Sequence, residues 1–486
     1  MTASRVAWLG YAVIAAAFAA LGFVHWVWSV TLRGPVMYGE GAVANAAILA
    51  RARLEYTAGG QWGDVAPIFT AANYPPLFLH LASIGDPFVT GRILSIASTL
   101  FVAGAIAYRA RPAGGIAAGA IALAWLGSVP VLQWGSALKP DLLALALTVA
   151  AVMALDVTAI TSPATPGAAT SRRASSRRYL IAGALLGLAA MAKPTALLPA
   201  VAMLVFVSRQ DRRGAMLGLA AGIVAALACA FATHGPEGGA LTHVIEWNEL
   251  AWRVDLAASL VFLGLVLFVV PLATIALTRP STTVVTAYTA GAAGIVLLGG
   301  REGATINYLL DLSAALALAL AGRAPLLASA PRYPIAGAVQ LIVALLVLNP
   351  FGVIPGRATT TGAWGDPERI ATVAAMNGPM LVEDSGLLVA SGRQPAVDDV
   401  FLWSRLHDRQ VSGGLVFEPG DDLLAAVRAG RFDAVVTEAD LSTLDATGGF
   451  ERQRWHRDLV SAILGRYSLQ PSPDRRPGSV FVYTRR

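Results

Sequence analysis

Residues 6–32, VAWLGYAVIAAAFAALGFVHWVWSVTL, form an apolar run of 27 residues without a formal charge. A helix of about 20 predominantly apolar residues crosses the hydrocarbon core of a bilayer, so this run predicts a membrane-spanning helix. The run is longer than the apolar part of a secretory signal peptide, and no clear small-residue cleavage site precedes Arg33. We therefore expect it to be a first span and not a removed leader.

The composition of the whole chain agrees with this interpretation. Of the 486 residues, 56% are hydrophobic and 14% are charged, whereas soluble domains carry about 25% charged residues. This excludes a soluble globular protein and a disordered chain. The net charge of +6 does not indicate a nucleic-acid partner, because the basic residues lie in short clusters between apolar runs, where the positive-inside rule places them. A lone cysteine, Cys229, excludes an intrachain disulfide and a cysteine-based metal site.

Further uncharged stretches follow the first one, and basic clusters separate them. The stretches are residues 93–108, 113–138, 142–155, 179–192, 194–208, 214–233, 256–278, 280–300, 312–322 and 333–356. The basic clusters are Arg109/Arg111, residues 172–178, residues 209–213, Arg279 and Arg323/Arg332. If these clusters face the cytoplasm, the alternate loops place the following acidic residues outside: Glu40, Asp64, Asp141, Glu237, Glu246, Glu249, Asp255 and Glu302.

The number of spans depends on residues 179–208, which form either one long helix or two short helices that meet at Lys193-Pro194. One long helix would move every later arginine cluster to the outer face, against the charge bias. The pattern therefore favours two short helices with an outward turn. This predicts about eleven spans with the C-terminus outside, and a flexible cytoplasmic linker over residues 159–178.

Two regions differ from the apolar part of the chain. The first is an outer loop over residues 33–87, where 41–56 could form an amphipathic helix in the membrane interface and Tyr74-Pro75-Pro76 precedes a short apolar run. The second begins at residue 357, where the composition becomes that of a soluble protein. Here we expect strands over 380–382, 432–436 and 479–484 and helices over 421–428 and 454–467. The sequence thus predicts a membrane domain, residues 1–356, and a small extracytoplasmic α/β domain, residues 357–486.

Ionisable side chains at the membrane edge are candidates for function, because they are costly there unless they are paired or wet. Glu40 follows the first span between two glycines, although a solvated loop carboxylate would explain it equally well. The chain has only two lysines, and proline follows each of them. Lys139-Pro140-Asp141 begins a helix, where stabilisation of the helix dipole alone would also place an aspartate. Lys193 at a helix tip favours an anionic partner such as phosphate, or else reaches lipid headgroups by snorkelling.

Two further loops on the same side, residues 243–255 and 299–311, carry polar and aromatic groups. His243 and Glu246 have the i, i+3 spacing of metal ligands, but two ligands are too few to predict a metal site. Together the loops and the charged residues form a cavity that suits group transfer from a lipid-phosphate donor. A carboxylate can take the proton of an attacking hydroxyl, and cations can stabilise the phosphate that leaves.

The order of short motifs along residues 1–350 resembles the GT-C integral membrane glycosyltransferases, the superfamily of the protein O-mannosyltransferases and the lipid A aminoarabinose transferase. The motifs are the acid after the first span, Tyr74-Pro75-Pro76-Leu77, Gly91-Arg92-Ile93-Leu94-Ser95, Lys139-Pro140-Asp141, Ala192-Lys193-Pro194-Thr195 and Asn307-Tyr308-Leu309. The resemblance implies a GT-C fold with two juxtamembrane helices, here about 41–57 and 75–85. It also implies a polyprenyl-phosphate sugar donor and inversion at the anomeric carbon.

The resemblance also implies roles for single residues. The first-loop acid of the family matches Glu40, which we expect to be the general base, and the acid after the third span matches Asp141, a second carboxylate that orients acceptor or sugar. Some relatives have a lysine where this chain has Tyr74, so we expect Lys193, Lys139 and Arg92 to bind the donor phosphate. The expected sugar or acceptor contacts are Tyr74, His243, Asn248, Asn307 and Tyr308.

The sequence therefore predicts a multi-pass glycosyltransferase, of the hexosyl or pentosyl type, in the inner membrane of a bacterium with its active site on the outer face. Its partners would be a polyprenyl-phosphate sugar, membrane lipid and a glycan, lipid or protein acceptor. No cofactor is required and no metal ligands are assigned, while a contribution from a divalent cation stays open. The alternatives are a secondary transporter and a lipid-sugar binding scaffold without turnover. A transporter would have paired broken helices in two repeat halves, a pattern that the long first loop does not fit.

Overall fold

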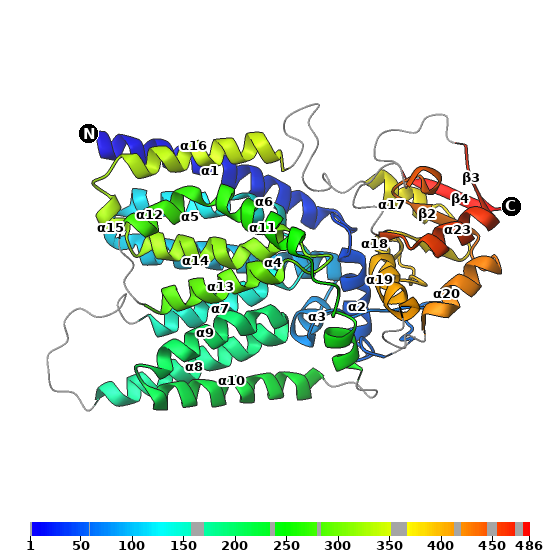
Figure 1. The fold of residues 1–486 in the computed structure, drawn as a ribbon, viewed down its shortest axis with the longest axis horizontal. Coiled ribbons are helices and arrows are strands. Elements are labelled where there is room, and N and C mark those ends of the chain that lie inside the picture. The colour runs from blue at the N-terminus through cyan, green and yellow to red at the C-terminus, as the bar shows by residue number, and fades with distance from the viewer. Residues whose placement is uncertain are drawn as a thin grey trace.

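Long helices lie side by side in one part of the molecule, and a small sheet with its own helices covers one end of them (Figure 1). The computed structural model describes residues 2–57, 59–156, 170–233, 239–278, 283–350, 367–412, 419–444, 454–471 and 480–486. The helices of the larger part are α1 (Ala3–Thr31), α4 (Pro87–Ala110), α5 (Gly115–Leu126), α6 (Val129–Trp134), α7 (Asp141–Leu155), α8 (Thr170–Ala192), α9 (Leu197–Ser208), α10 (Arg212–Thr233), α11 (Val254–Leu267), α12 (Val269–Leu277), α13 (Val284–Leu298), α14 (Leu310–Ala321), α15 (Ala324–Leu327) and α16 (Arg332–Leu348).

Every apolar stretch predicted from the sequence overlaps at least one of these helices. Within the described residues, three helical segments are long and apolar enough to cross a bilayer, namely Ala3–Thr31, Pro87–Ala113 and Arg212–Thr233. The pair α11 and α12, bent by 71°, adds a fourth if it is one span. The shorter apolar helices have 10–17 residues. The expected number of about eleven spans is therefore not confirmed and stays a prediction.

The helical segment over residues 179–208 is interrupted at Lys193-Pro194, as the charge pattern predicted. Helix α8 ends at Ala192, residues Pro194–Ala196 form one 3-10 turn (η3), and α9 begins at Leu197. Gly183 and Gly187 of α8 lie directly against Gly218 and Gly222 of α10, so close that a Cβ atom at Gly183 would collide with the backbone of α10. Small residues at this spacing let two membrane helices approach closely. Because α8 and α10 run in the same direction, α9 between them runs the opposite way.

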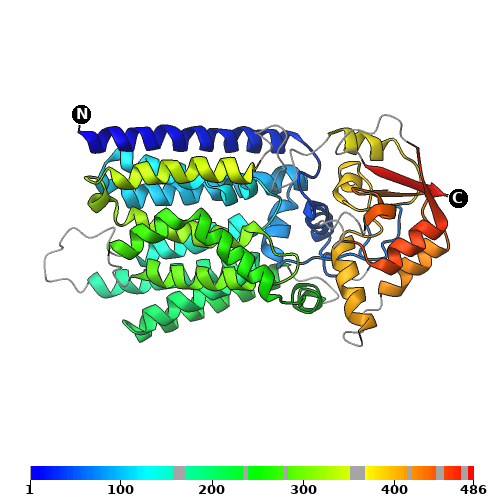
Figure 2. The same cartoon turned by 45° about the horizontal axis from the view of Figure 1, so that its top comes forward.

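The two ends of the helical part differ in their polar groups. At one end, Arg109 forms an ion pair with Asp156 and donates to the Leu318 carbonyl at 3.0 Å, and Ser4 contacts Ala328. The first loop and the C-terminal region lie at the other end (Figures 1 and 2). Arg109 thus lies at the end opposite the first loop (Figure 1), as the charge pattern predicted, although the acidic Asp156 lies beside it. Which end faces the outside stays a prediction.

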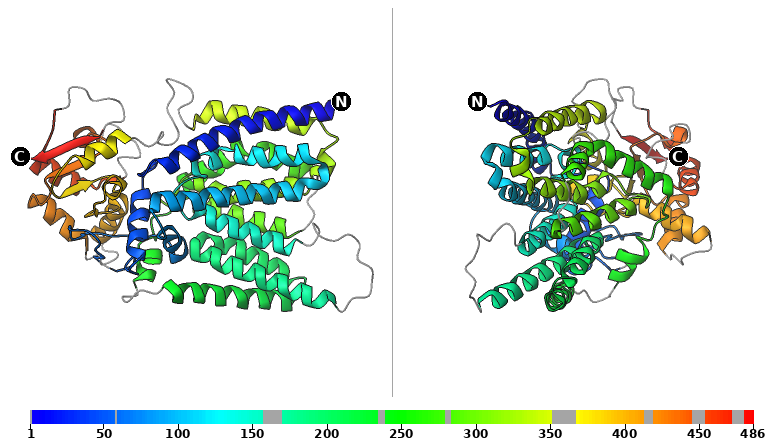
Figure 3. Two further views of the ribbon diagram at one scale, coloured as in Figure 1. Left: turned by 180° about the vertical axis from the view of Figure 1, so that it is seen from behind. Right: turned by 60° about the vertical axis from the view of Figure 1, so that its left-hand side comes forward.

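The first loop forms two helices, α2 (Glu40–Ala50) and α3 (Pro76–Ala82), between the long helices and the C-terminal region (Figure 3). They correspond to the expected helices 41–57 and 75–85, although α2 ends earlier. All residues of α2 except Ile48 are buried. The expectation of an amphipathic helix in the membrane interface is thus wrong, because α2 packs on α3 on one side and on α18 (Gly386–Ala390) on another.

The C-terminal region contains a four-stranded sheet in the order β1-β2-β4-β3. Strands β1 (Met380–Val382) and β2 (Ala434–Thr437) are parallel, whereas β4 (Phe481–Arg485) is antiparallel to both β2 and β3 (Tyr467–Leu469). The first two are completely buried and, apart from Thr437, consist of apolar residues, as in strands covered on both faces. Besides α18, the helices here are α17 (Pro367–Ala374), α19 (Val400–Val411), α20 (Pro419–Arg428) and α23 (Arg457–Arg466).

The expected elements of this region are largely present. The predicted strands 380–382, 432–436 and 479–484 correspond to β1, β2 and β4, and the predicted helices to α20 and α23. Strand β3 was not predicted, because residue 467 ends the predicted helix 454–467 and residues 468 and 469 lie in no predicted element. Helices α17 and α19 were missed as well. The following predicted features lie outside the described residues: the linker up to residue 169, Glu237, Arg279, the boundary at residues 356–357 and the first residue of the 479–484 strand.

Candidate active site

Asp141 is the centre of a buried polar cluster at the end of the helices that faces the C-terminal region. It is the first residue of α7. Its Oδ1 atom accepts a hydrogen bond from Lys193 Nζ at 2.5 Å and another from Asn307 Nδ2 at 2.7 Å. The other oxygen, Oδ2, is buried and has no hydrogen-bond partner among the described residues. A carboxylate oxygen of this kind is a ready acceptor for a proton or a hydroxyl group.

The other members of this cluster come from the turns at Lys193 and at η5 (Ile306–Leu309). The Lys193 ammonium lies 4.9 Å from the centre of the Tyr308 ring, which is a cation–π contact. The Thr305 hydroxyl donates to the Asn307 side-chain oxygen at 2.8 Å, which turns the amide NH2 group toward Asp141. Four residues that the sequence analysis singled out, Asp141, Lys193, Asn307 and Tyr308, thus lie together.

Lys139 and Tyr74 lie beside this cluster. Lys139 Nζ donates to the Gly39 carbonyl at 2.6 Å and lies 5.8 Å from the centre of the Tyr74 ring. A small cavity borders both side chains, and Gly39 and Asp399 line it too. Gly39 has φ +79°, and a Cβ atom there would lie 2.9 Å from Lys139 Nζ, so glycine fits this position. Burial lowers the pKa of Lys139, and the carboxylates of Glu40 and Asp399 oppose this shift.

Glu40 and Arg92 form a fully buried ion pair, with Oε2 and Nη2 2.5 Å apart. The same Glu40 carboxylate accepts from the backbone N–H groups of Val36 at 2.8 Å and Leu138 at 2.7 Å. The two terminal nitrogens of Arg92 also donate to the carbonyls of Ser29, Leu32 and Gly34.

This geometry bears on the expected roles of Arg92 and Glu40. Arg92 cannot bind a donor phosphate in this arrangement, because its terminal N–H groups are used within the protein and none of its side chain is exposed. Glu40 has a hydrogen bond on each oxygen and is likewise fully buried, so neither oxygen lies free to receive a proton. The pair instead ties the end of α1 and the start of α2 to α4 and to the segment before Asp141.

Two further residues that we expected to contact sugar or acceptor, His243 and Asn248, help to pack the first loop. His243 is 2% exposed, its Nδ1 accepts from the Ala72 N–H at 3.1 Å, and burial lowers its pKa to about 4. The Asn248 amide donates to three backbone carbonyls, those of Asn73, His243 and Val244. In this arrangement the Nδ1 atom of His243 and the amide of Asn248 bind within the protein, and the expectation that these side chains contact sugar or acceptor stays a prediction.

The C-terminal region supplies acidic residues that the sequence analysis missed. Asp399 Oδ1 accepts from the Tyr38 hydroxyl at 3.0 Å, and Asp398 Oδ2 accepts from the Asn45 amide at 3.1 Å. Arg454 lies 4.0 Å above the Tyr38 ring. Burial raises the pKa values of Asp398 and Asp399. Consecutive acids before α19 are a common helix-capping pattern, so only the tertiary structure reveals that they reach the first loop.

A third acid at this contact, Asp384, makes the stability of the region depend on pH. Burial, with the Glu438 carboxylate second, raises the pKa of Asp384 to about 8, from about 3.9 in an unfolded chain. The folded state therefore holds this proton more tightly, and its stabilising contribution is complete below about pH 4 and is lost as the pH rises to about 8. We expect Asp384→Asn to raise the unfolding temperature at pH 8.5 and to change it little at pH 4, as measured by thermal unfolding at both values.

The matched control for this prediction is Asp433→Asn, which changes a half-exposed carboxylate that pairs with Arg485. It should affect the unfolding temperature equally at both pH values. An Asp384→Asn variant with the same pH dependence as the unmodified protein would contradict the assignment.

Comparison with known proteins finds similar folds at low sequence identity. No protein-family model and no curated protein matches the chain. One similar structure is the oligosaccharyltransferase of Archaeoglobus fulgidus tethered to an acceptor peptide with the NVT sequon, at 11% identity over 99% of this chain and 74% of that one, with a TM-score of 0.47. Another is the oligosaccharyltransferase AglB of the same organism with an inhibitory peptide and a dolichol-phosphate, at 12% identity over the same shares, with a TM-score of 0.48.

Both similar structures are oligosaccharyltransferases. At this level of similarity they assign no role to a residue. The roles below rest on the geometry of this chain.

Proposed function

We propose that this chain is a membrane glycosyltransferase that moves a sugar from a polyprenyl-phosphate carrier to an acceptor hydroxyl. One observation carries the proposal: Asp141 has a buried oxygen without a partner, and a buried lysine is bound to its other oxygen. A base and a cation side by side suit a reaction in which a hydroxyl loses a proton while a phosphate leaves.

In the proposed reaction the acceptor oxygen attacks the anomeric carbon from the side opposite the phosphate. A bond forms between that oxygen and the carbon, the bond between the carbon and the phosphate oxygen breaks, and the configuration inverts. Asp141 Oδ2 takes the proton of the acceptor hydroxyl. Lys193 and Lys139 stabilise the negative charge on the departing polyprenyl phosphate, which needs no proton to leave.

The roles of the two carboxylates are therefore exchanged relative to those that the motif order implies. Asp141 becomes the base, and Glu40 with Arg92 becomes a pair that positions the segment leading to Lys139 and Asp141, through the hydrogen bond from the Leu138 N–H to Glu40. Tyr74 lines the small cavity beside Lys139, whereas Asn307 contacts Asp141 and Tyr308 contacts Lys193. These three residues are the proposed sugar or acceptor contacts.

The orientation of the protein in the membrane and the nature of its substrates complete the proposal. The site end would face away from the cytoplasm of a bacterium, because the basic residues Arg109 and Arg323 lie at the opposite end. The donor sugar would be a hexose or a pentose, and the acceptor a glycan, lipid or protein.

The test is donor consumption by the full chain in nanodiscs with a panel of radiolabelled polyprenyl-phosphate sugars. We expect at least one donor to release polyprenyl phosphate in amounts equal to the sugar transferred. A donor that binds without being consumed would favour a binding scaffold. Ion-coupled uptake into proteoliposomes without donor cleavage would favour a transporter, and either result would overturn the proposal.

A further inference from the structure

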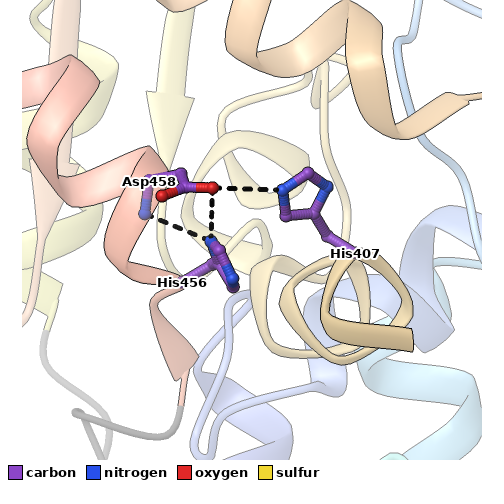
Figure 4. A group of neighbouring side chains, drawn as sticks. All are labelled: His407, His456 and Asp458. Carbon is purple, nitrogen blue, oxygen red and sulfur yellow. Dashed lines mark hydrogen bonds and ion pairs between the residues drawn. The ribbon is translucent and has the colours of Figure 1, made fainter. Parts of the chain in front are cut away.

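Three side chains in the C-terminal region face one another across two helices, away from the proposed active site. His407 lies on α19, His456 is the residue that caps α23, and Asp458 lies in the first turn of α23 (Figure 4). Asp458 Oδ2 lies 3.7 Å from His407 Nε2 and 3.7 Å from His456 Nδ1. The three ligand atoms all lie within 4.8 Å of one another.

His407 is the unusual member of this group. Only 6% of its side chain is exposed, yet neither ring nitrogen has a hydrogen-bond partner among the described residues. Its ring stacks on Trp403 with an angle of 9° between the planes, which fixes its orientation. Buried polar atoms are normally hydrogen-bonded, so an oriented imidazole without such a bond calls for another kind of partner. In Figure 4 one ring nitrogen points at the Asp458 carboxylate.

His456 is held as a metal-ligating histidine usually is. Its Nε2 pairs with Asp408 Oδ1 at 3.0 Å, which places the proton on Nε2 and leaves the lone pair on Nδ1. That lone pair accepts from the Asp458 N–H at 3.1 Å and caps α23. A metal ion bound to Nδ1 would replace this single hydrogen bond.

We propose that His407, His456 and Asp458 bind a zinc ion, with water as the fourth ligand. Zinc takes nitrogen and oxygen ligands at about 2.0–2.2 Å in tetrahedral geometry, which puts neighbouring ligand atoms about 3.4 Å apart. The two distances of 3.7 Å need only small movements to reach this value. Two imidazoles with one carboxylate also favour zinc over calcium or magnesium, which prefer oxygen ligands alone.

The ion would join α19 to α23 and thereby stiffen the face that meets the first loop. Helix α19 carries its ligand near one end and begins next to Asp399, whose carboxylate accepts from Tyr38. This role is structural and does not depend on the proposed glycosyl transfer.

The test is zinc binding by the full chain, without a histidine tag, in nanodiscs after treatment with EDTA. We expect calorimetry to detect one equivalent of Zn²⁺ and thermal unfolding to shift upward when the ion is added. Asp458→Asn should weaken binding at least tenfold, and His407→Gln should abolish it. The Asp458 side chain is 54% exposed, so its replacement leaves folding intact.

Asp255→Asn is the matched control, because Asp255 is a similarly exposed carboxylate, 59%, in an ion pair elsewhere in the chain. It should bind zinc like the unmodified protein. The site is refuted if the unmodified protein takes up no saturable zinc, or if Asp458→Asn takes up as much. Visible absorption of bound Co²⁺, characteristic of tetrahedral coordination, gives a second readout that is independent of stability.

Discussion

Replacing Asp141 by asparagine is expected to lower donor turnover by about 10²–10⁴-fold, the usual contribution of a general base. An asparagine oxygen can still accept from the Lys193 ammonium and from Asn307, so the local structure should persist. The side chain can no longer take a proton from the acceptor. Single-turnover release of polyprenyl phosphate measures this step directly, and donor binding should weaken much less than the rate.

Asp156→Asn provides a control within the same helix. Asp156 lies just beyond the C-terminal end of α7, is buried like Asp141 and pairs with Arg109, at the opposite end of the helical part. Its replacement removes the same charge from an ion pair but should leave the rate per folded molecule unchanged. Equal losses in the two variants would show that the effect at Asp141 is structural. Unchanged turnover in Asp141→Asn, with loss in Glu40→Gln, would restore Glu40 as the base.

The second large effect is expected on stability. Arg92→Met leaves the Glu40 carboxylate buried without its partner, and removal of one member of a buried ion pair costs about 3–5 kcal/mol. We expect a marked fall in the unfolding temperature in nanodiscs. The double variant Glu40→Gln with Arg92→Met should regain part of the loss, because it leaves no buried charge.

The exposed pair Arg253–Asp255 gives the comparison, since Arg253→Met should change the unfolding temperature little. An Arg92→Met variant that is fully stable but binds the donor poorly would contradict the structural role. It would then support the phosphate-binding role that the motif order implies.

Periodicity and charge bias predicted much of the fold because they depend on local sequence. The apolar run 6–32 became α1, and the positive-inside argument alone placed a break at Lys193-Pro194. Strands β1 and β2 were predicted because most of their residues are apolar. Helix α19 was missed although it is amphipathic, and β3 was missed because three residues give too short a pattern.

The arrangement of the site was harder to predict, because it depends on residues far apart in the chain. Asp141, Lys193, Asn307 and Tyr308 were among the residues expected on one side, and the structure brings these four together. Nothing in the sequence shows that Arg92 points at Glu40, 52 residues earlier, instead of at a ligand. No local pattern indicates that His407 and His456 lie close together, because they are 49 positions apart in the chain.

The hydrogen bond between Tyr38 and Asp399 joins residues 361 positions apart. The first loop therefore acquires this contact with the C-terminal region only after Asp399 has been synthesised. A ribosome adds about 5–20 residues per second, and the loop emerges roughly 20–70 s before its partner exists. During that interval the face of α2 that packs on α18 has no cover, whereas α3 and α4 are already present. The contact between the first loop and the C-terminal region therefore forms after the helices that carry Asp141 and Lys193 have been synthesised.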